Sequence, residues 1–198
     1  MLLRPRQKEF VERSLEALIS HGNALGVAPT GAGKTILFSE VIGRYIKANS
    51  AKALVIAHRD ELTNQNKSKF SLVNPLISTS VFDSKNKSWN GQVTFAMVQT
   101  LSLEANINTM PPIDLLVIDE AHHAAANTYR TIIEKALQLN PNCIVFGVTA
   151  TPNRSDGKGL RDVFSNVCDQ ISLGELIRSG HLVTPRTFVI DVGVKKQL

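Results

Sequence analysis

The sequence has few cysteines and no long run of apolar residues. Cys143 and Cys168 are its two cysteines, and their separation does not match the ligand spacing of a metal site. Each is interpreted as a small core residue in a reducing compartment. No apolar stretch approaches the length of a membrane span, and the first residues, Met1 to Arg6, contain charge and proline instead of an apolar secretion signal. We therefore predict a cytoplasmic protein with no membrane partner.

The sequence also lacks internal repeats and low-complexity tracts. Its composition of 43% hydrophobic and 20% charged residues argues against disorder, and its 198 residues suit one ordinary domain. The formal net charge is +5, which permits binding to a polyanion but does not by itself establish it.

Short apolar runs alternate with helical patterns along almost the whole chain. Apolar residues recur at helical spacing in three segments, 11–19, 38–46 and 129–137, which are predicted as helices, and a more polar helix is predicted at 59–70. Five short runs are predicted as buried strands: 24–28, 53–57, 93–96, 115–118 and 143–148. This alternation predicts an α/β fold, with an open, mostly parallel sheet and helices on both faces.

A glycine-rich loop lies between the first predicted strand and the helix that follows. Its small residues let successive backbone N–H groups point at phosphate oxygens, and the helix adds the positive end of its dipole. In such a loop, Lys34 reaches the β- and γ-phosphates and Thr35 supplies a hydroxyl to Mg²⁺. Ala28 stands where the general pattern has its first glycine. We predict a nucleotide site made of Thr30, Gly31, Ala32, Gly33, Lys34 and Thr35.

An acidic pair, Asp119 and Glu120, follows the apolar run at 115–118. It is expected at the carboxyl end of a buried strand, where open sheets bind ligands. Asp119 can hold Mg²⁺ there, and Glu120 can activate an attacking water. An isolated pair of this kind is more often a helix cap or a solvated corner, but the preceding phosphate loop favours catalysis. We predict that Lys34, Asp119 and Glu120 are catalytic, and that Thr35 and Asp119 bind the metal.

The phosphate loop and the Asp119-Glu120-Ala121-His122 segment together resemble superfamily-two helicases of the DEAH-type branch. Further segments follow that family's order, and the resemblance covers roughly residues 3 to 185. It implies a RecA-like P-loop lobe in which His122, Thr149 and Thr151 couple the nucleotide site to the nucleic-acid site. By the same resemblance, Arg59, Gln99 and Thr100 contact the tracked strand, and Gln7 bonds the adenine edge. Arg6 departs from the aromatic residue that related segments often carry at this position.

The resemblance implies ATP and Mg²⁺ as cofactors, and DNA or RNA as partner, with DNA favoured. Residues 1–185 are expected to form the N-terminal ATP-binding lobe, and 186–198 a linker or the start of an absent second lobe. That second lobe, in cis or in trans, would supply arginines to the γ-phosphate, so hydrolysis by this chain alone is expected to be very slow. The segments 154–160 and 176–180 are similar to those of bacterial and phage repair or restriction-type members.

Simpler interpretations stay open for several of these residues. Arg59 could end a strand in solvent, Gln99 and Thr100 could cap a helix, and Gln7 could begin one. Two other functions also stay open for the whole chain. It could be a single-lobe module without enzymatic activity that binds nucleic acid or a partner, or a P-loop kinase that acts on a small molecule.

Overall fold

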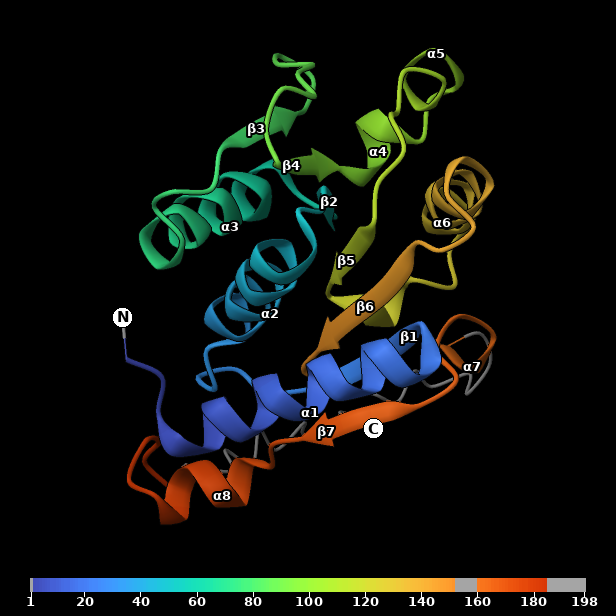
Figure 1. Cartoon of the computed structure of the whole chain (residues 1–198). Helices are drawn as coiled ribbons and strands as arrows, with labels where there is room; N and C mark the ends of the chain where they lie inside the picture. The colour runs from blue at the N-terminus through green and yellow to red at the C-terminus, as the bar shows by residue number, and fades with distance from the viewer. Residues whose placement is uncertain (1, 152–159, 185–198) are drawn as a thin grey trace, which may run out of the picture.

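The computed structural model describes residues 2–151 and 160–184, and in this part of the chain seven strands form one sheet (Figure 1). Their order is β3-β4-β2-β5-β6-β1-β7, and every strand pair is parallel. The strands are β1 Asn23–Val27, β2 Ala53–Ala57, β3 Thr79–Phe82, β4 Val93–Met97, β5 Leu115–Asp119, β6 Ile144–Thr149 and β7 Val167–Gln170. The predicted open parallel sheet is confirmed. Pro152, the segment 154–159 and the predicted linker 186–198 lie outside the described residues.

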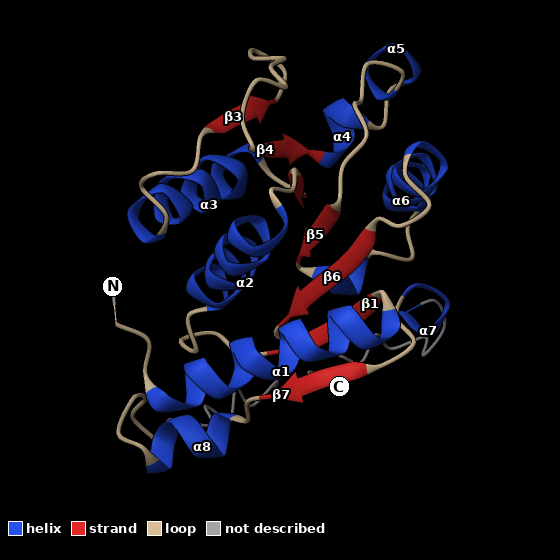
Figure 2. Cartoon of the chain, viewed as in Figure 1, coloured by secondary structure: helices blue, strands red, loops and turns tan. Residues whose placement is uncertain are grey.

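Helices cover both faces of the sheet, as Figure 2 shows. One face packs against α1 Pro5–His21, α2 Lys34–Asn49, α3 Asp60–Val73 and α8 Leu173–Arg178. The other face packs against α4 Val98–Leu101, α5 Glu104–Ile107, α6 Asn127–Leu139 and α7 Leu160–Val163. A 3-10 turn, Ala121–His123, follows β5.

The central strands are apolar throughout because each of their faces is covered by helices. In β5, Leu115 and Val117 belong to the core beneath α1, α2 and α3, whereas Leu116 and Ile118 belong to the core beneath α4 and α6. This strand is fully buried along its length. Alternation across the sheet therefore produces two separate hydrophobic cores from one short apolar run.

The first helix has clear start and stop signals. Pro5 occupies its first turn, and Gly22, with φ of 72°, ends it in the left-handed region that favours glycine. The ring of Phe10 packs so closely on β1 that a Cβ added to Gly26 would lie 2.4 Å from it. Ile19, which the sequence pattern placed on the apolar face, is 78% exposed. The apolar face of α1 is thus narrower than the pattern predicted.

Two strands were not anticipated from the sequence. Both β3 and β7 lie at edges of the sheet and are short and partly polar. An edge strand has only one neighbouring strand, so its sequence need not be a continuous apolar run. No helix within the described ranges combines the length and apolar character that crossing a bilayer requires.

Candidate functional site

The strand order brings the glycine-rich loop and the acidic motif to one edge of the sheet. β6 lies between β1 and β5, so the carboxyl ends of these three strands are neighbours. A cavity of about 560 Å³ opens there. It is lined by Pro29, Thr30, Gly31, Gly33, Lys34, Thr35, Ile36, Gln65, Asn66, Lys69, Leu72, Asp119 and Glu120. The structure therefore joins most of the predicted nucleotide and catalytic residues in one cavity and adds a contribution from α3.

The backbone of the loop depends on two glycines. Gly31 and Gly33 have φ angles of 89° and 86°, in the left-handed region that other residues rarely adopt. A Cβ at Gly31 would lie 2.8 Å from the Leu182 side chain, and a Cβ at Gly33 would lie 2.9 Å from Gln7 Nε2. Helix α2 begins at Lys34, directly after this turn, so the positive end of its dipole is at the loop. This is the arrangement of an anion-binding loop.

Lys34 and Glu120 face each other across the cavity. Lys34 Nζ lies 3.4 Å from Glu120 Oε1, and the other carboxylate oxygen lies 3.4 Å from His122 Nδ1. Glu120 has a φ of 52°, which is uncommon for a residue other than glycine. A positive φ at a residue other than glycine persists where the surrounding structure fixes it. Glu120 is thus held between a lysine and a histidine, at the site where the sequence predicted the base.

Asp119 lies deeper than Glu120 and is 5% exposed. Its Oδ2 accepts a hydrogen bond from Asn66 Nδ2 at 2.8 Å, and its Oδ1 accepts one from the Glu120 backbone N–H at 2.9 Å. Burial raises the pKa of Asp119, while the hydrogen bond from Asn66 opposes that rise. A buried carboxylate beside the Thr35 hydroxyl supplies the oxygen ligands that Mg²⁺ prefers. These residues fit the cation that the phosphate loop implies.

The predicted coupling residues are in direct contact. His122 Nδ1 lies 3.1 Å from Thr149 Oγ1, and the Thr151 backbone N–H donates to the same hydroxyl at 3.2 Å. Thr149 is fully buried at the end of β6. The acidic motif after β5 is therefore connected to the segment after β6 through one hydroxyl group.

The predicted nucleic-acid residues are at the same edge of the sheet but differ in exposure. Arg59, after β2, and Gln99, after β4, are exposed. Gln99 Nε2 lies 2.8 Å from His58 Nδ1, which joins these two segments. Thr100 is 7% exposed, and its carbonyl accepts a hydrogen bond from Asn106 Nδ2 at 2.7 Å. The structure thus leaves Arg59 and Gln99 accessible and buries Thr100.

Gln7 contacts the phosphate loop instead of facing open solvent. Its Nε2 donates to the Ala32 carbonyl at 2.9 Å, and its Oε1 accepts from the Arg4 backbone N–H at 3.0 Å. The side chain is 9% exposed. Both ends of the amide are therefore engaged, and in this structure Gln7 supports the loop from the first turn of α1.

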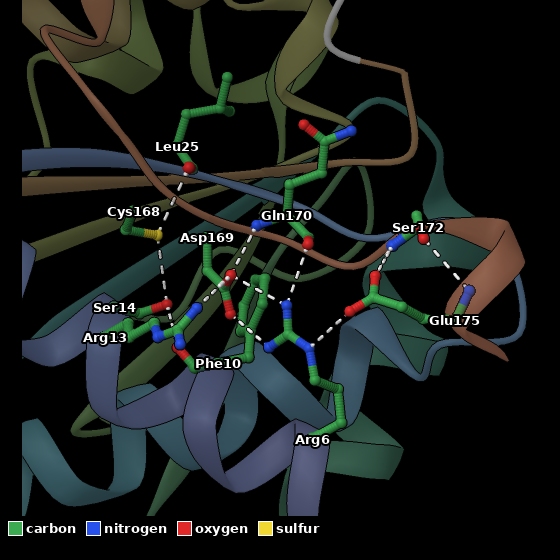
Figure 3. A network of polar contacts seen from close by, with 10 residues as sticks. All are labelled: Arg6, Phe10, Arg13, Ser14, Leu25, Cys168, Asp169, Gln170, Ser172 and Glu175. Carbon is green, nitrogen blue, oxygen red and sulfur yellow. Dashed lines mark hydrogen bonds and ion pairs between the residues drawn. The ribbon is translucent and has the colours of Figure 1, made fainter. Parts of the chain in front are cut away.

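Arg6 replaces the expected aromatic residue and forms the centre of a polar network (Figure 3). It makes a bidentate ion pair with Asp169 in β7, donates to the Gln170 carbonyl at 3.0 Å, and pairs with Glu175 in α8 at 3.3 Å. Burial would raise the pKa of Asp169, but the hydrogen bonds and charge of Arg6 hold it below its usual range. Arg6 thus fastens α1 to β7 and α8.

Asn66 is a site residue that sequence reasoning missed. It lies on the buried face of α3, is 1% exposed, and contacts both Thr35 and Asp119. A polar residue at a buried helical position was the available signal. That signal could not be used, because the sequence alone does not say which element α3 faces.

The comparisons agree with this geometry. The family described as "Type III restriction enzyme, res subunit" matches residues 1–154. "Putative mitochondrial ATP-dependent helicase irc3" of Schizosaccharomyces pombe is 33% identical over 95% of this chain and 32% of its own length. "ATP-dependent DNA helicase MPH1" of Saccharomyces cerevisiae is 30% identical over 73% of this chain and 16% of its own length.

The solved structures that resemble this chain show the same fold. The helicase domain of Hef from Pyrococcus furiosus superposes with a TM-score of 0.71, at 24% identity, over 82% of this chain and 36% of that one. The chain spans about a third or less of the length of the curated relatives it matches. Taken with the loop, the acidic motif and the strand order, the match to residues 1–154 shows that the chain belongs to the family of the Type III restriction enzyme res subunit, with the RecA-like fold of the helicase domains that it resembles.

Proposed function

We propose that this chain binds ATP with Mg²⁺ in the 560 Å³ cavity, and that hydrolysis there drives movement along nucleic-acid strands or their separation. The observation that carries this proposal is the convergence of Lys34 and Thr35, at the start of α2, and Asp119 and Glu120, at the end of β5, on one cavity. A P-loop kinase for small molecules would share Lys34 and Thr35. It would not account for the exposed Arg59 and Gln99 at the same edge of the sheet.

Each side chain has a role that follows from its position. Lys34 exchanges its contact with Glu120 for the β- and γ-phosphates, which leaves the carboxylate free to accept a proton from the attacking water. Thr35 and Asp119 would hold Mg²⁺, which when bound neutralises charge that develops on the phosphates. Gln7 keeps the loop in position through the Ala32 carbonyl.

We further propose DNA as the tracked strand, contacted through its phosphates by the exposed Arg59 and Gln99, while the buried Thr100 needs a local rearrangement to reach it. The name of the relative MPH1 supports DNA over RNA, and the Asp119-to-His122 segment supports the DEAH-type branch, of the restriction-like kind. Contact among His122, Thr149 and Thr151 connects the ends of β5 and β6, and we propose that these residues couple the nucleotide site to the nucleic-acid site.

We further propose that residues 1–185 form one lobe and that 186–198 are a linker or the start of a second lobe. The relatives extend about three times as far, which leaves room for that second lobe. Arginines from a second lobe contribute about 10³–10⁵ in rate in other phosphoryl-transfer enzymes, so the chain alone should hydrolyse ATP very slowly.

A calorimetric titration with a non-hydrolysable ATP analogue tests the nucleotide site. Lys34→Ala should abolish most binding without loss of the circular dichroism signal. Lys47→Ala, in the exposed last turn of the same helix, should bind as the unaltered chain does. Equal affinity in both variants would contradict the proposal. ATPase assays with a second lobe added, with and without DNA or RNA, then separate a motor from a binding module or a kinase.

A further inference from the structure

The buried face of α3 carries an asparagine where the helix passes the nucleotide cavity. Thr63, Asn66 and Phe70 follow one another at helical spacing, and each is at most 1% exposed. A buried amide costs free energy unless its donor and its acceptor are both hydrogen-bonded. The partners of Asn66 therefore explain why an amide stands at this position.

Those partners are the two side chains proposed to hold Mg²⁺. Asn66 Nδ2 donates to Asp119 Oδ2 at 2.8 Å, and Asn66 Oδ1 accepts from Thr35 Oγ1 at 3.4 Å. Thr35 is in the first turn of α2 and Asp119 ends β5, so one amide connects the two elements. The second bond is long, which means that Asn66 fixes the carboxylate more firmly than the hydroxyl.

The chemistry of the three groups sets the direction of both hydrogen bonds. An ionised carboxylate can only accept, so the amide N–H must face Asp119 and the amide oxygen is left for Thr35. The amide oxygen can also only accept, so the Thr35 hydroxyl is the donor in its bond to Asn66. Thr35 and Asp119 both line the cavity, and each then presents oxygen lone pairs to it. Mg²⁺ requires ligands in that state.

We propose that Asn66 is a positioning residue for Mg²⁺, which holds the Asp119 carboxylate in place and sets the hydrogen-bond direction of Thr35, so that both present lone pairs to the cation. This inference rests on the proposed function and adds a third residue, from a third element, to the metal site. Partners of metal ligands are typically worth about 10–100-fold in metal affinity.

Asn66→Ala removes both hydrogen bonds and tests the inference in the whole chain. A fluorescent, non-hydrolysable ATP analogue is titrated at a series of Mg²⁺ concentrations and again in EDTA. The Mg²⁺ concentration needed for half-maximal enhancement of binding should rise about 10-fold or more, and affinity in EDTA should not change. In an Asp119→Asn background, Asn66→Ala should have little further effect on the Mg²⁺ concentration needed. The residue that Asn66 holds most firmly, at position 119, is then no longer a carboxylate.

Asn74→Ala is the matched control. Asn74 is also a buried asparagine between α3 and α2, where its Nδ2 donates to the Ser39 carbonyl at 2.8 Å, but it does not line the cavity. It should lower thermal stability without altering the dependence on Mg²⁺. If Asn66→Ala does not fold, Asn66→Leu keeps the branched shape, lacks both polar atoms and should give the same rise in the Mg²⁺ concentration needed.

The outcomes separate this inference from the proposed function. If the unaltered chain binds no nucleotide, the proposed function fails and Asn66 has no metal to position. If the unaltered chain binds more tightly with Mg²⁺ and the folded Asn66 variant needs the same Mg²⁺ concentration for half-maximal enhancement, the inference is overturned while the function stands. A loss of affinity that is equal in Mg²⁺ and in EDTA would also overturn it, since that is the signature of general structural damage.

Discussion

Replacement of Arg6 by alanine removes the residue that fastens α1 to β7 and α8. Removing one partner of a fully buried ion pair typically costs about 3–5 kcal/mol. Arg6 is 26% exposed, and Asp169 keeps its bond to Arg13 at 3.1 Å, so the expected cost is about 2 kcal/mol. For a chain of this length, that corresponds to a fall in melting temperature of about 4–8 °C. This loss of stability affects α1, β7 and α8 together, because Arg6 lies in α1 and contacts residues of the other two elements.

Urea unfolding of the unaltered chain, Arg6→Ala, Asp169→Asn and the double variant measures this energy. The two substitutions should be non-additive by about 1–2 kcal/mol, because each removes the same ion pair. Arg13→Ala is the control: Arg13 is 57% exposed and makes one contact to the same carboxylate, so its loss should cost less than about 1 kcal/mol. Additive effects, or equal costs for Arg6 and Arg13, would refute this account of the network.

The pH dependence gives the same prediction an independent check. The folded-state pKa values of Asp169 and Glu175 are both lowered, that of Glu175 to about 2, mainly through hydrogen bonds from Ser172. A lowered folded-state pKa stabilises the protein above the unfolded pKa, and this contribution is lost as pH falls through the folded value. The cost of Arg6→Ala should therefore be constant near neutral pH and should shrink below about pH 4.

Three further outcomes are expected from the site. Glu120→Gln should keep ATP binding but lower turnover by about 10²-fold or more once a second lobe is present. Steady-state hydrolysis and a binding titration measure the two effects, and an unchanged rate of hydrolysis would show that Glu120 is not the base. Gln7→Ala leaves the buried Ala32 carbonyl without its donor and should weaken binding of ATP and of tripolyphosphate in equal proportion; a loss confined to ATP would instead indicate that Gln7 reads the base. Nucleic-acid binding should be independent of sequence, and the logarithm of the binding constant should fall with the logarithm of the salt concentration at a slope of about −2 to −4. Fluorescence anisotropy measures this slope, and an affinity that does not vary with salt would contradict phosphate contacts.

The central part of the fold could be predicted from the sequence because its signals are local. β2 coincides with its apolar run at 53–57, and the glycines around Lys34 identify a loop whose chemistry depends on adjacent residues. Strands at the sheet edges could not be predicted in this way. β7 contains Cys168 and Asp169, and its two end residues, Val167 and Gln170, are exposed. It therefore carries no continuous apolar run that the sequence could reveal.

The same distinction applies to the site. Lys34, Thr35, Asp119 and Glu120 were identified because each is part of a compact motif. The partner of Arg6 lies 163 positions away along the chain, and Asn66 contacts the site only because α3 packs against α2. Contacts of this kind depend on tertiary packing, which neither spacing nor composition records. The engaged amide of Gln7 is a third example, since a motif names a residue but not the direction of its side chain.

The position of β7 bears on where an excised, independently folding unit would have to end. The family match stops at residue 154, yet β7 pairs with β1 along Leu25–Val27, and Leu182 packs against the phosphate loop at Gly31. A chain cut at the end of the match would turn β1 into an edge strand with unpaired backbone groups, which is a template for aggregation. It would also leave Arg6 without a carboxylate partner. The family match covers the residues of the nucleotide site. The pairing of β7 with β1 and the packing of Leu182 on the phosphate loop indicate that a stable folding unit must extend beyond Leu182.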